Sequence, residues 1–205
     1  MLERFRASAA RLLTPLARFL NRHHVSPDLV TAVGTAGVMF GALICFPAGW
    51  LWQGTLVVTF FVLADMLDGQ MAKLNGTASA WGAFLDSSLD RLGDGAVFGG
   101  LLLYFAYGRG EPVWAAVTLA ALVFGQLTSY VRARAESLGF QANGGLAARA
   151  DRLLIVLVGS LLAGLGVPYV LEVAMTFLAV AGLATVAQRS SSVYRQAKMS
   201  PRELG

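Results

Sequence analysis

Six long apolar runs follow one another along this 205-residue chain and decide most of what it can fold into. They cover approximately residues 29–50, 51–72, 83–107, 113–131, 153–167 and 168–188. Each run is close to the roughly 20 residues that a helix needs to cross a bilayer, although the fifth is short. Only 14% of the residues are charged, against about 25% in typical soluble domains. The pattern predicts an all-α integral membrane protein with six transmembrane helices in one domain.

The first 22 residues differ from these runs, because arginines interrupt their apolar residues at helical spacing. The arginines are Arg4, Arg6, Arg11, Arg18 and Arg22. This pattern favours an amphipathic helix lying in the membrane interface. A cleaved signal peptide would need an uninterrupted apolar core, which this segment lacks. We therefore predict a juxtamembrane helix over 1–22, a six-helix domain over 23–190 and a cytoplasmic tail over 191–205.

Basic residues orient the predicted bundle, since they gather on the cytoplasmic side of membrane proteins. In a six-span arrangement nearly all the flanking arginines and lysines fall on one side, and Arg109 is the exception. We expect a cell-membrane protein with both termini in the cytoplasm. The single Cys45 lies in an apolar run, which excludes an intrachain disulfide or a thiolate metal site. The net charge of +4 reflects lipid-facing basic flanks, and nothing suggests a nucleic-acid partner.

Four aspartates lie where the second run ends and the third begins, in the stretch "DMLDGQMAKLNGTASAWGAFLDSSLD". Asp65 and Asp68 are three residues apart and Asp86 and Asp90 are four apart, so each pair shares a helical face. Four converging carboxylates repel one another unless a hard divalent cation neutralises them. Oxygen-only ligands favour Mg²⁺ or Mn²⁺ over zinc. Two metals held by carboxylates are a common device for phosphoryl transfer.

The four acids are also compatible with helix-end salt bridges or with a proton or cation pathway, as in a transporter. Small residues beside the acids argue against both. Gly69 and Ala72 flank the first pair and Gly82 precedes the second, while Lys73 supplies a cation. Bulky side chains are therefore absent where a phosphate would have to approach. A transporter does not need that space.

These residues together resemble the signature of the CDP-alcohol phosphotransferase family. The matching pattern is Asp65-x2-Asp68-Gly69-x2-Ala72-Lys73-x8-Gly82-x3-Asp86-x3-Asp90. One position departs from the family, which commonly has arginine where Lys73 stands, and lysine lacks bidentate phosphate recognition. The resemblance implies an enzyme that moves the phosphatidyl group of CDP-diacylglycerol to an alcohol and releases CMP. It also implies two Mg²⁺ ions, with Mn²⁺ as a possible substitute.

The resemblance further implies roles for individual residues. Asp65 and Asp86 would bridge both metals, Asp68 would bind the first and Asp90 the second, and Asp90 would act as the general base. Asp94, one turn further on, lies outside the signature, and we interpret it as a helix-packing or supporting acid. The CDP-diacylglycerol contacts would be Asp28, Leu29, Val30, Thr31, Gly69, Lys73 and Ser79.

Arginines at the cytoplasmic ends of the later runs suggest a phosphorylated acceptor. The candidates are Ser129, Arg132, Arg152 and Arg189, although charges flanking a membrane span would give the same pattern. The segments "SYVRARAE" and "FFVLADMLDGQMAK" resemble the actinobacterial branch of the family, which uses inositol phosphate. Glycerol 3-phosphate, giving phosphatidylglycerophosphate, is the alternative acceptor. The resemblance to the actinobacterial branch implies a homodimer in membrane lipid, with an active site open to the cytoplasm.

Overall fold

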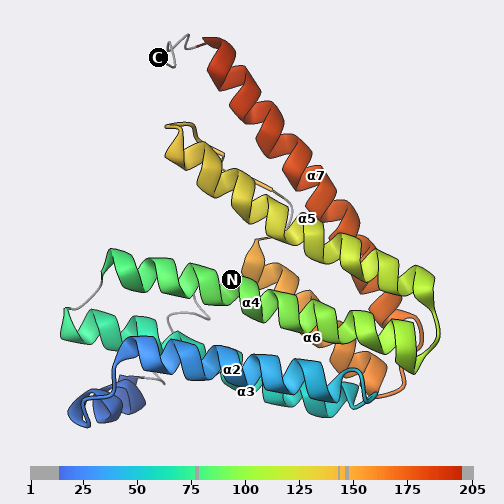
Figure 1. Ribbon diagram of the computed structural model, residues 1–205, viewed down its shortest axis with the longest axis horizontal. Coiled ribbons are helices and arrows are strands. Elements are labelled where there is room, and N and C mark those ends of the chain that lie inside the picture. Colours follow the sequence, from blue (N-terminus) through green and yellow to red (C-terminus); the bar gives the residue numbers. More distant parts are fainter. Residues whose placement is uncertain (1–13, 77–78, 143, 146–147, 200–205) are drawn as a thin grey trace. The chain divides into compact units, whose positions relative to one another are not determined.

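The computed structural model describes residues 14–76, 79–142, 144–145 and 148–199, and in these ranges the chain is helical and has no strand (Figure 1). A π-helical turn, η1 Tyr104–Gly108, extends the third of its long helices, and residues 14–22 form a helical stretch before the first. The long helices are α2 Pro27–Cys45, α3 Leu51–Asn75, α4 Ala80–Leu103, α5 Pro112–Ser137, α6 Arg149–Gly164 and α7 Val170–Met199. Each overlaps one predicted apolar run, which confirms the all-α prediction.

Four of the described helices are long and apolar enough to cross a membrane. These segments are Pro27–Cys45, Leu51–Ala72, Pro112–Ser137 and Val170–Met199. The other two long helices do not meet these conditions. The helix α6 has only 16 residues, and α4 carries several charged side chains. The chain is therefore a membrane protein, and six spans remain a prediction.

The start of α2 is capped by the residues around it. Ser26 is the N-cap, and its side-chain oxygen accepts a hydrogen bond from the Leu29 N–H at 3.2 Å. Pro27 occupies the first turn, where its missing N–H costs nothing. Asp28 follows in the same turn, near the positive end of the helix dipole. The cap thus fixes the residues that border the candidate site.

One compact unit contains the described residues 14–46 and 53–100, which are the helical stretch 14–22, α2 and most of α3 and α4. Small residues let its helices approach closely. Gly37 and Gly41 of α2 face Phe61 and Val57 of α3, and Gly100 of α4 lies against the Ala42 backbone of α2.

The helical stretch 14–22 packs onto this unit through one buried side chain. Ala17 is fully buried against Leu67 and Met71 of α3. Leu16 and Phe19 are exposed, so the stretch has one protein-facing side and one outward apolar side. Residues 1–13 of the predicted amphipathic helix lie outside the described residues, and its location in the interface remains a prediction.

The second compact unit contains residues 47–52 and the described residues from 101 to 199. Here α7 packs against both α5 and α6. Gly182 of α7 faces Phe124 of α5, and Gly159 of α6 faces Ala174 of α7. The helix α7 continues to Met199, so the predicted boundary at residue 190 falls inside it.

Arg109, the exception to the predicted charge asymmetry, is paired within this second unit. It donates to Glu172 at 2.6 Å and to Glu111 at 2.9 Å. Burial of the guanidinium lowers its pKa, but the Glu172 and Glu111 carboxylates raise that pKa by more, and the net direction is upward. The Glu172 side chain is 4% exposed, so the pair neutralises a buried acid at the start of α7.

Replacing Gly100 by alanine tests the close approach of α4 to α2. A Cβ there would collide with the Ala42 backbone, which has no flexible end that can move away. We expect Gly100→Ala to lower stability by about 1–3 kcal/mol, measured by thermal unfolding in detergent. Gly95→Ala on the same helix is the matched control, because its Cβ would meet nothing within 4 Å. Equal stability of both variants would contradict this packing.

Candidate metal centre and binding pocket

Three of the four predicted metal ligands come together at the ends of α3 and α4. Single carboxylate oxygens of Asp65, Asp86 and Asp90 all lie within 4.8 Å of one another. Asp65 and Asp90 are half-buried and Asp86 is exposed. The four-residue spacing places Asp86 and Asp90 on the same side of α4.

This donor set fits a hard divalent cation. Oxygen ligands suit Mg²⁺ or Mn²⁺, and no described histidine or cysteine belongs to the carboxylate cluster. The cation would also remove the repulsion among three negative charges. Asp94, one turn beyond Asp90, is buried at 5% exposure, and its helix-packing or supporting role stays a prediction.

Asp68, the fourth predicted ligand, makes hydrogen bonds to its neighbours instead of joining that group of three. Its Oδ2 accepts from the Thr31 hydroxyl at 2.5 Å, and its Oδ1 accepts from the Gly69 N–H. The Thr31 Oγ1 also lies 3.1 Å from the Pro27 carbonyl. These bonds attach the Asp68 side chain to the first turn of α2, and the two-metal arrangement remains a prediction.

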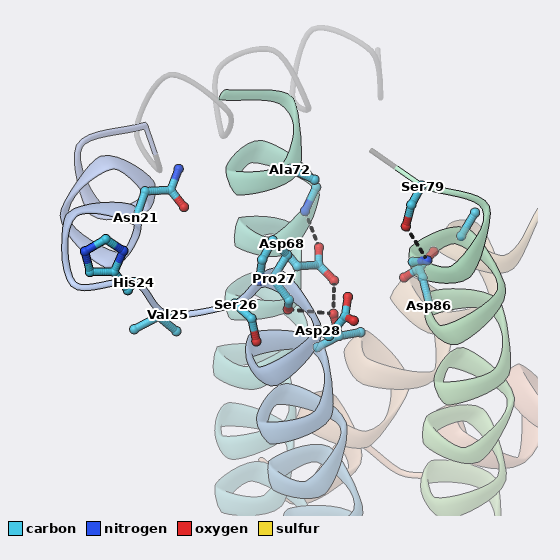
Figure 2. A pocket seen from close by; sticks show the side chains of 14 residues that line it. Asn21, His24, Val25, Ser26, Pro27, Asp28, Asp68, Ala72, Ser79 and Asp86 are labelled. Atoms are coloured by element: carbon cyan, nitrogen blue, oxygen red, sulfur yellow. Dashed lines mark hydrogen bonds between the residues drawn. The ribbon is translucent and has the colours of Figure 1, made fainter. Parts of the chain in front are cut away.

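A pocket of about 640 Å³ adjoins the carboxylates within the same compact unit (Figure 2). Asp68 of α3 and Asp86 of α4 both line it, so Asp86 belongs to the pocket and to the carboxylate cluster. The remaining lining residues are Asn21, His24, Val25, Ser26, Pro27, Asp28, Thr31, Gly69, Ala72, Ser79, Gly82 and Ala83.

Backbone groups and small residues shape the pocket wall. A Cβ added at Gly69 would meet nothing within 4 Å, so this glycine opens directly onto free space. The Ser79 hydroxyl accepts from the Gly82 N–H at 3.0 Å and thereby caps α4. The Trp81 indole N–H donates to Asp28 Oδ2 at 3.2 Å and joins the starts of α2 and α4. The wall offers both acceptors and room for a large polar ligand.

The structure separates the predicted nucleotide residues into two groups. Asp28, Thr31, Gly69 and Ser79 line the pocket. Leu29 and Val30 do not line it. The Leu29 side chain is exposed, and Val30 packs against the Ala17, Leu67 and Met71 cluster. The Lys73 side chain lies outside the described residues.

The sequence reasoning missed several of the lining residues, among them the polar Asn21 and His24. Asn21 and His24 precede the capped start of α2, and the Asn21 amide donates to the Met71 carbonyl at 3.5 Å. His24 has a φ of 56°, a left-handed conformation that is uncommon outside glycine. A polar "NRHH" segment directly before a helix cap was the available signal.

The predicted acceptor residues belong to the second compact unit, where two of them meet at Thr128 of α5. Arg152 is 4% exposed and its Nη1 donates to Thr128 Oγ1 at 3.2 Å. Arg189 donates to the Thr128 carbonyl at 2.6 Å and to the Gly144 carbonyl at 2.9 Å. The sequence reasoning had not singled out Thr128, since a buried threonine in an apolar run carries no signal of its own.

The other two acceptor candidates lie on the same helix as Thr128. Arg132 is exposed and its Nε donates to Glu136 Oε1 at 2.8 Å, one turn along α5. Ser129 is half-buried beside Thr128. Arg152 and Arg189 thus both contact Thr128 of α5, and Arg132, one turn along that helix, has Glu136 as its counter-ion.

Comparison with known proteins links this geometry to one family. The family model described as CDP-alcohol phosphatidyltransferase matches residues 24–186. The chain is 51% identical to a phosphatidylinositol phosphate synthase of Cutibacterium acnes, over 95% of this chain and 98% of that protein. It is 48% identical to one of Streptomyces avermitilis, over 93% of this chain and 81% of that protein.

Solved structures of the Mycobacterium tuberculosis phosphatidylinositol phosphate synthase are also similar, at 44% identity. The one with CDP-DAG bound superimposes with a TM-score of 0.87, over 90% of this chain and 94% of that one. The complex with manganese and citrate gives a TM-score of 0.83, over 89% and 88%.

Metal binding by the carboxylate cluster is tested with Mn²⁺ and a charge-removing substitution. We expect Asp86→Asn to weaken Mn²⁺ binding roughly 100-fold, measured by electron paramagnetic resonance, because a neutral amide is a poor ligand for a hard cation. Asp28→Asn is the control, since Asp28 lines the pocket outside the carboxylate cluster. Unchanged Mn²⁺ affinity in Asp86→Asn would show that the cation binds elsewhere.

Proposed function

This chain belongs to the CDP-alcohol phosphatidyltransferase family, and from that premise we propose that it transfers the phosphatidyl group of CDP-diacylglycerol to an inositol phosphate. The acceptor is 1D-myo-inositol 3-phosphate, also called L-myo-inositol 1-phosphate, and the products are phosphatidylinositol phosphate and CMP. The observation that carries the proposal is Asp86, which belongs both to the carboxylate cluster and to the pocket. Family membership makes the chain an enzyme, and the transporter hypothesis for the acids is dropped.

In this proposal the donor lies in the pocket with its diphosphate beside the carboxylates. Gly69 leaves space for the phosphates, Ser79 and Lys73 bind them, and Asp28 and Thr31 contact the nucleotide. Asp65, Asp68, Asp86 and Asp90 hold two Mg²⁺ or Mn²⁺ ions. Bound divalent cations supply charge neutralisation for the phosphoryl groups.

Asp90 has the additional role of general base in this proposal. It takes the proton from the attacking hydroxyl, whose oxygen forms a bond to the β-phosphorus as the bond from that phosphorus to CMP breaks. A carboxylate held near the reacting phosphate by its helix is well placed for this transfer. Asp65 and Asp86 would use more of their lone pairs to hold the ions, which would leave them fewer for a proton.

The acceptor assignment rests on the arginines of the second unit and on the relatives' names. Ser129, Arg132, Arg152 and Arg189 would bind the acceptor's phosphate, since guanidinium groups recognise phosphate bidentately. The relatives from Cutibacterium acnes and Streptomyces avermitilis are named phosphatidylinositol phosphate synthases, which favours inositol phosphate over glycerol 3-phosphate. We place the enzyme in the cell membrane as a homodimer, with six spans, cytoplasmic termini and a cytoplasmic active site.

A panel of acceptors tests this proposal, with CMP release as the readout. We expect purified enzyme to use inositol phosphate well and free inositol poorly, because the uncharged polyol makes no phosphate contact with the arginines. Glycerol 3-phosphate is the informative competitor, since it shares the phosphate but lacks the ring. If it is used as well as inositol phosphate, the chain is a phosphatidylglycerophosphate synthase instead.

The donor pocket is tested by filling the space at Gly69. A methyl group there meets no protein atom, so Gly69→Ala should fold normally yet occupy room that the diphosphate needs. We expect KM for CDP-diacylglycerol to rise roughly tenfold, with KM for the acceptor little changed. Gly95→Ala, another helical glycine with nothing within 4 Å of its Cβ, should behave as wild type. An unchanged donor KM in Gly69→Ala would place the donor elsewhere.

A further inference from the structure

Thr128 of α5 contacts arginines from two different helices. Its side-chain oxygen accepts from Arg152 of α6 at 3.2 Å, and its carbonyl accepts from Arg189 of α7 at 2.6 Å. Thr128 itself is 1% exposed, and its hydroxyl and carbonyl oxygens already make these contacts, so it acts on a ligand only through the two arginines. Resting on the proposed acceptor pocket, we propose that Thr128 is a positioning residue that sets the separation of the Arg152 and Arg189 guanidinium groups for one phosphate.

The Thr128 hydroxyl is oriented for this contact by its own helix. Its Oγ1 donates to the Gly125 carbonyl at 2.7 Å. A hydroxyl has one proton and two lone pairs, so this donation leaves the oxygen as an acceptor toward Arg152. A buried guanidinium needs such acceptors, because a lost hydrogen bond in this setting is costly. Valine has nearly the same shape as threonine and offers no acceptor.

Gly125 supplies the space in which the Arg152 side chain lies. A Cβ at residue 125 would be 3.2 Å from Arg152 Nε and 3.7 Å from its Cζ. Gly125 is therefore the surface of α5 on which the guanidinium rests, and Thr128, three residues on, lies on the same helical face. Two features of α5 therefore position Arg152: the absence of a side chain at Gly125 and the oriented hydroxyl of Thr128.

Arg189 is held by backbone groups on two segments. Besides the Thr128 carbonyl it donates through Nε to the Gly144 carbonyl at 2.9 Å, between α5 and α6. A guanidinium has five N–H donors, so two backbone bonds fix its plane and still permit bidentate contact with a phosphate. Since the same threonine fixes both arginines, the phosphate meets a preformed pair of cations and less ordering entropy is lost on binding.

Thr128→Val tests the proposal, with steady-state CMP release at varied inositol phosphate and varied CDP-diacylglycerol. We expect KM for inositol phosphate to rise roughly tenfold, while kcat and KM for CDP-diacylglycerol change less than about threefold. Thr128→Ser, which keeps the hydroxyl, should restore the acceptor KM. Thr118→Val is the matched control, because Thr118 is also buried on α5 and its hydroxyl bonds only the Trp114 carbonyl among the described contacts.

The proposal is overturned if Thr128→Val leaves the acceptor KM unchanged, if both KM values rise together, or if Thr128→Ser is equally impaired. Should Thr128→Val fail to fold, Thr128→Ala is measured against the same criteria. Arg152→Gln, assayed in parallel, separates this inference from the acceptor pocket itself. If Arg152→Gln leaves the acceptor KM unchanged, the pocket is wrong; if it raises that KM and Thr128→Val does not, only the positioning role fails.

Discussion

Mutual repulsion among carboxylates is the constraint on which the site depends. Three aspartates place oxygens within 4.8 Å of one another. At an effective dielectric constant of about 20, two unit charges at that separation repel by roughly 3–4 kcal/mol. Helix packing holds the acids together against this cost, through glycines that let α2, α3 and α4 approach closely. A divalent cation converts the same arrangement from repulsive to attractive, and this makes cation binding the natural function of the carboxylates.

In the proposed reaction, the two compact units have different roles. The first contains the carboxylates and the pocket at the capped start of α2, and its residues suit a nucleotide diphosphate. The second contains the arginines that meet on α5, and its residues suit a phosphorylated acceptor. Each set of side chains is ordered by helices of its own unit. In the proposal, one set would bind the phosphatidyl donor and the other would bind the acceptor.

Much of this architecture follows from sequence alone, because apolar run length and aspartate spacing are local properties. The helices from Pro27 to Met199 overlap the predicted runs, and Asp65, Asp86 and Asp90 meet as their spacing indicates. Helix ends are less predictable, since α7 passes residue 190 and α4 continues into a π-helical turn. Side-chain partners depend on tertiary packing. Thr31 contacts Asp68, and two arginines contact Thr128. No local sequence pattern predicts either contact.

Anomalous diffraction from crystals soaked in Mn²⁺ tests the central claim most directly, because it locates the cation without any assumption about the reaction. The account predicts two peaks at the ends of α3 and α4, both beside Asp86, one toward Asp68 and the other toward Asp90. Absence of a peak among Asp65, Asp86 and Asp90 at saturating Mn²⁺, or peaks only at other acidic residues, would contradict the assignment of these carboxylates as the metal centre.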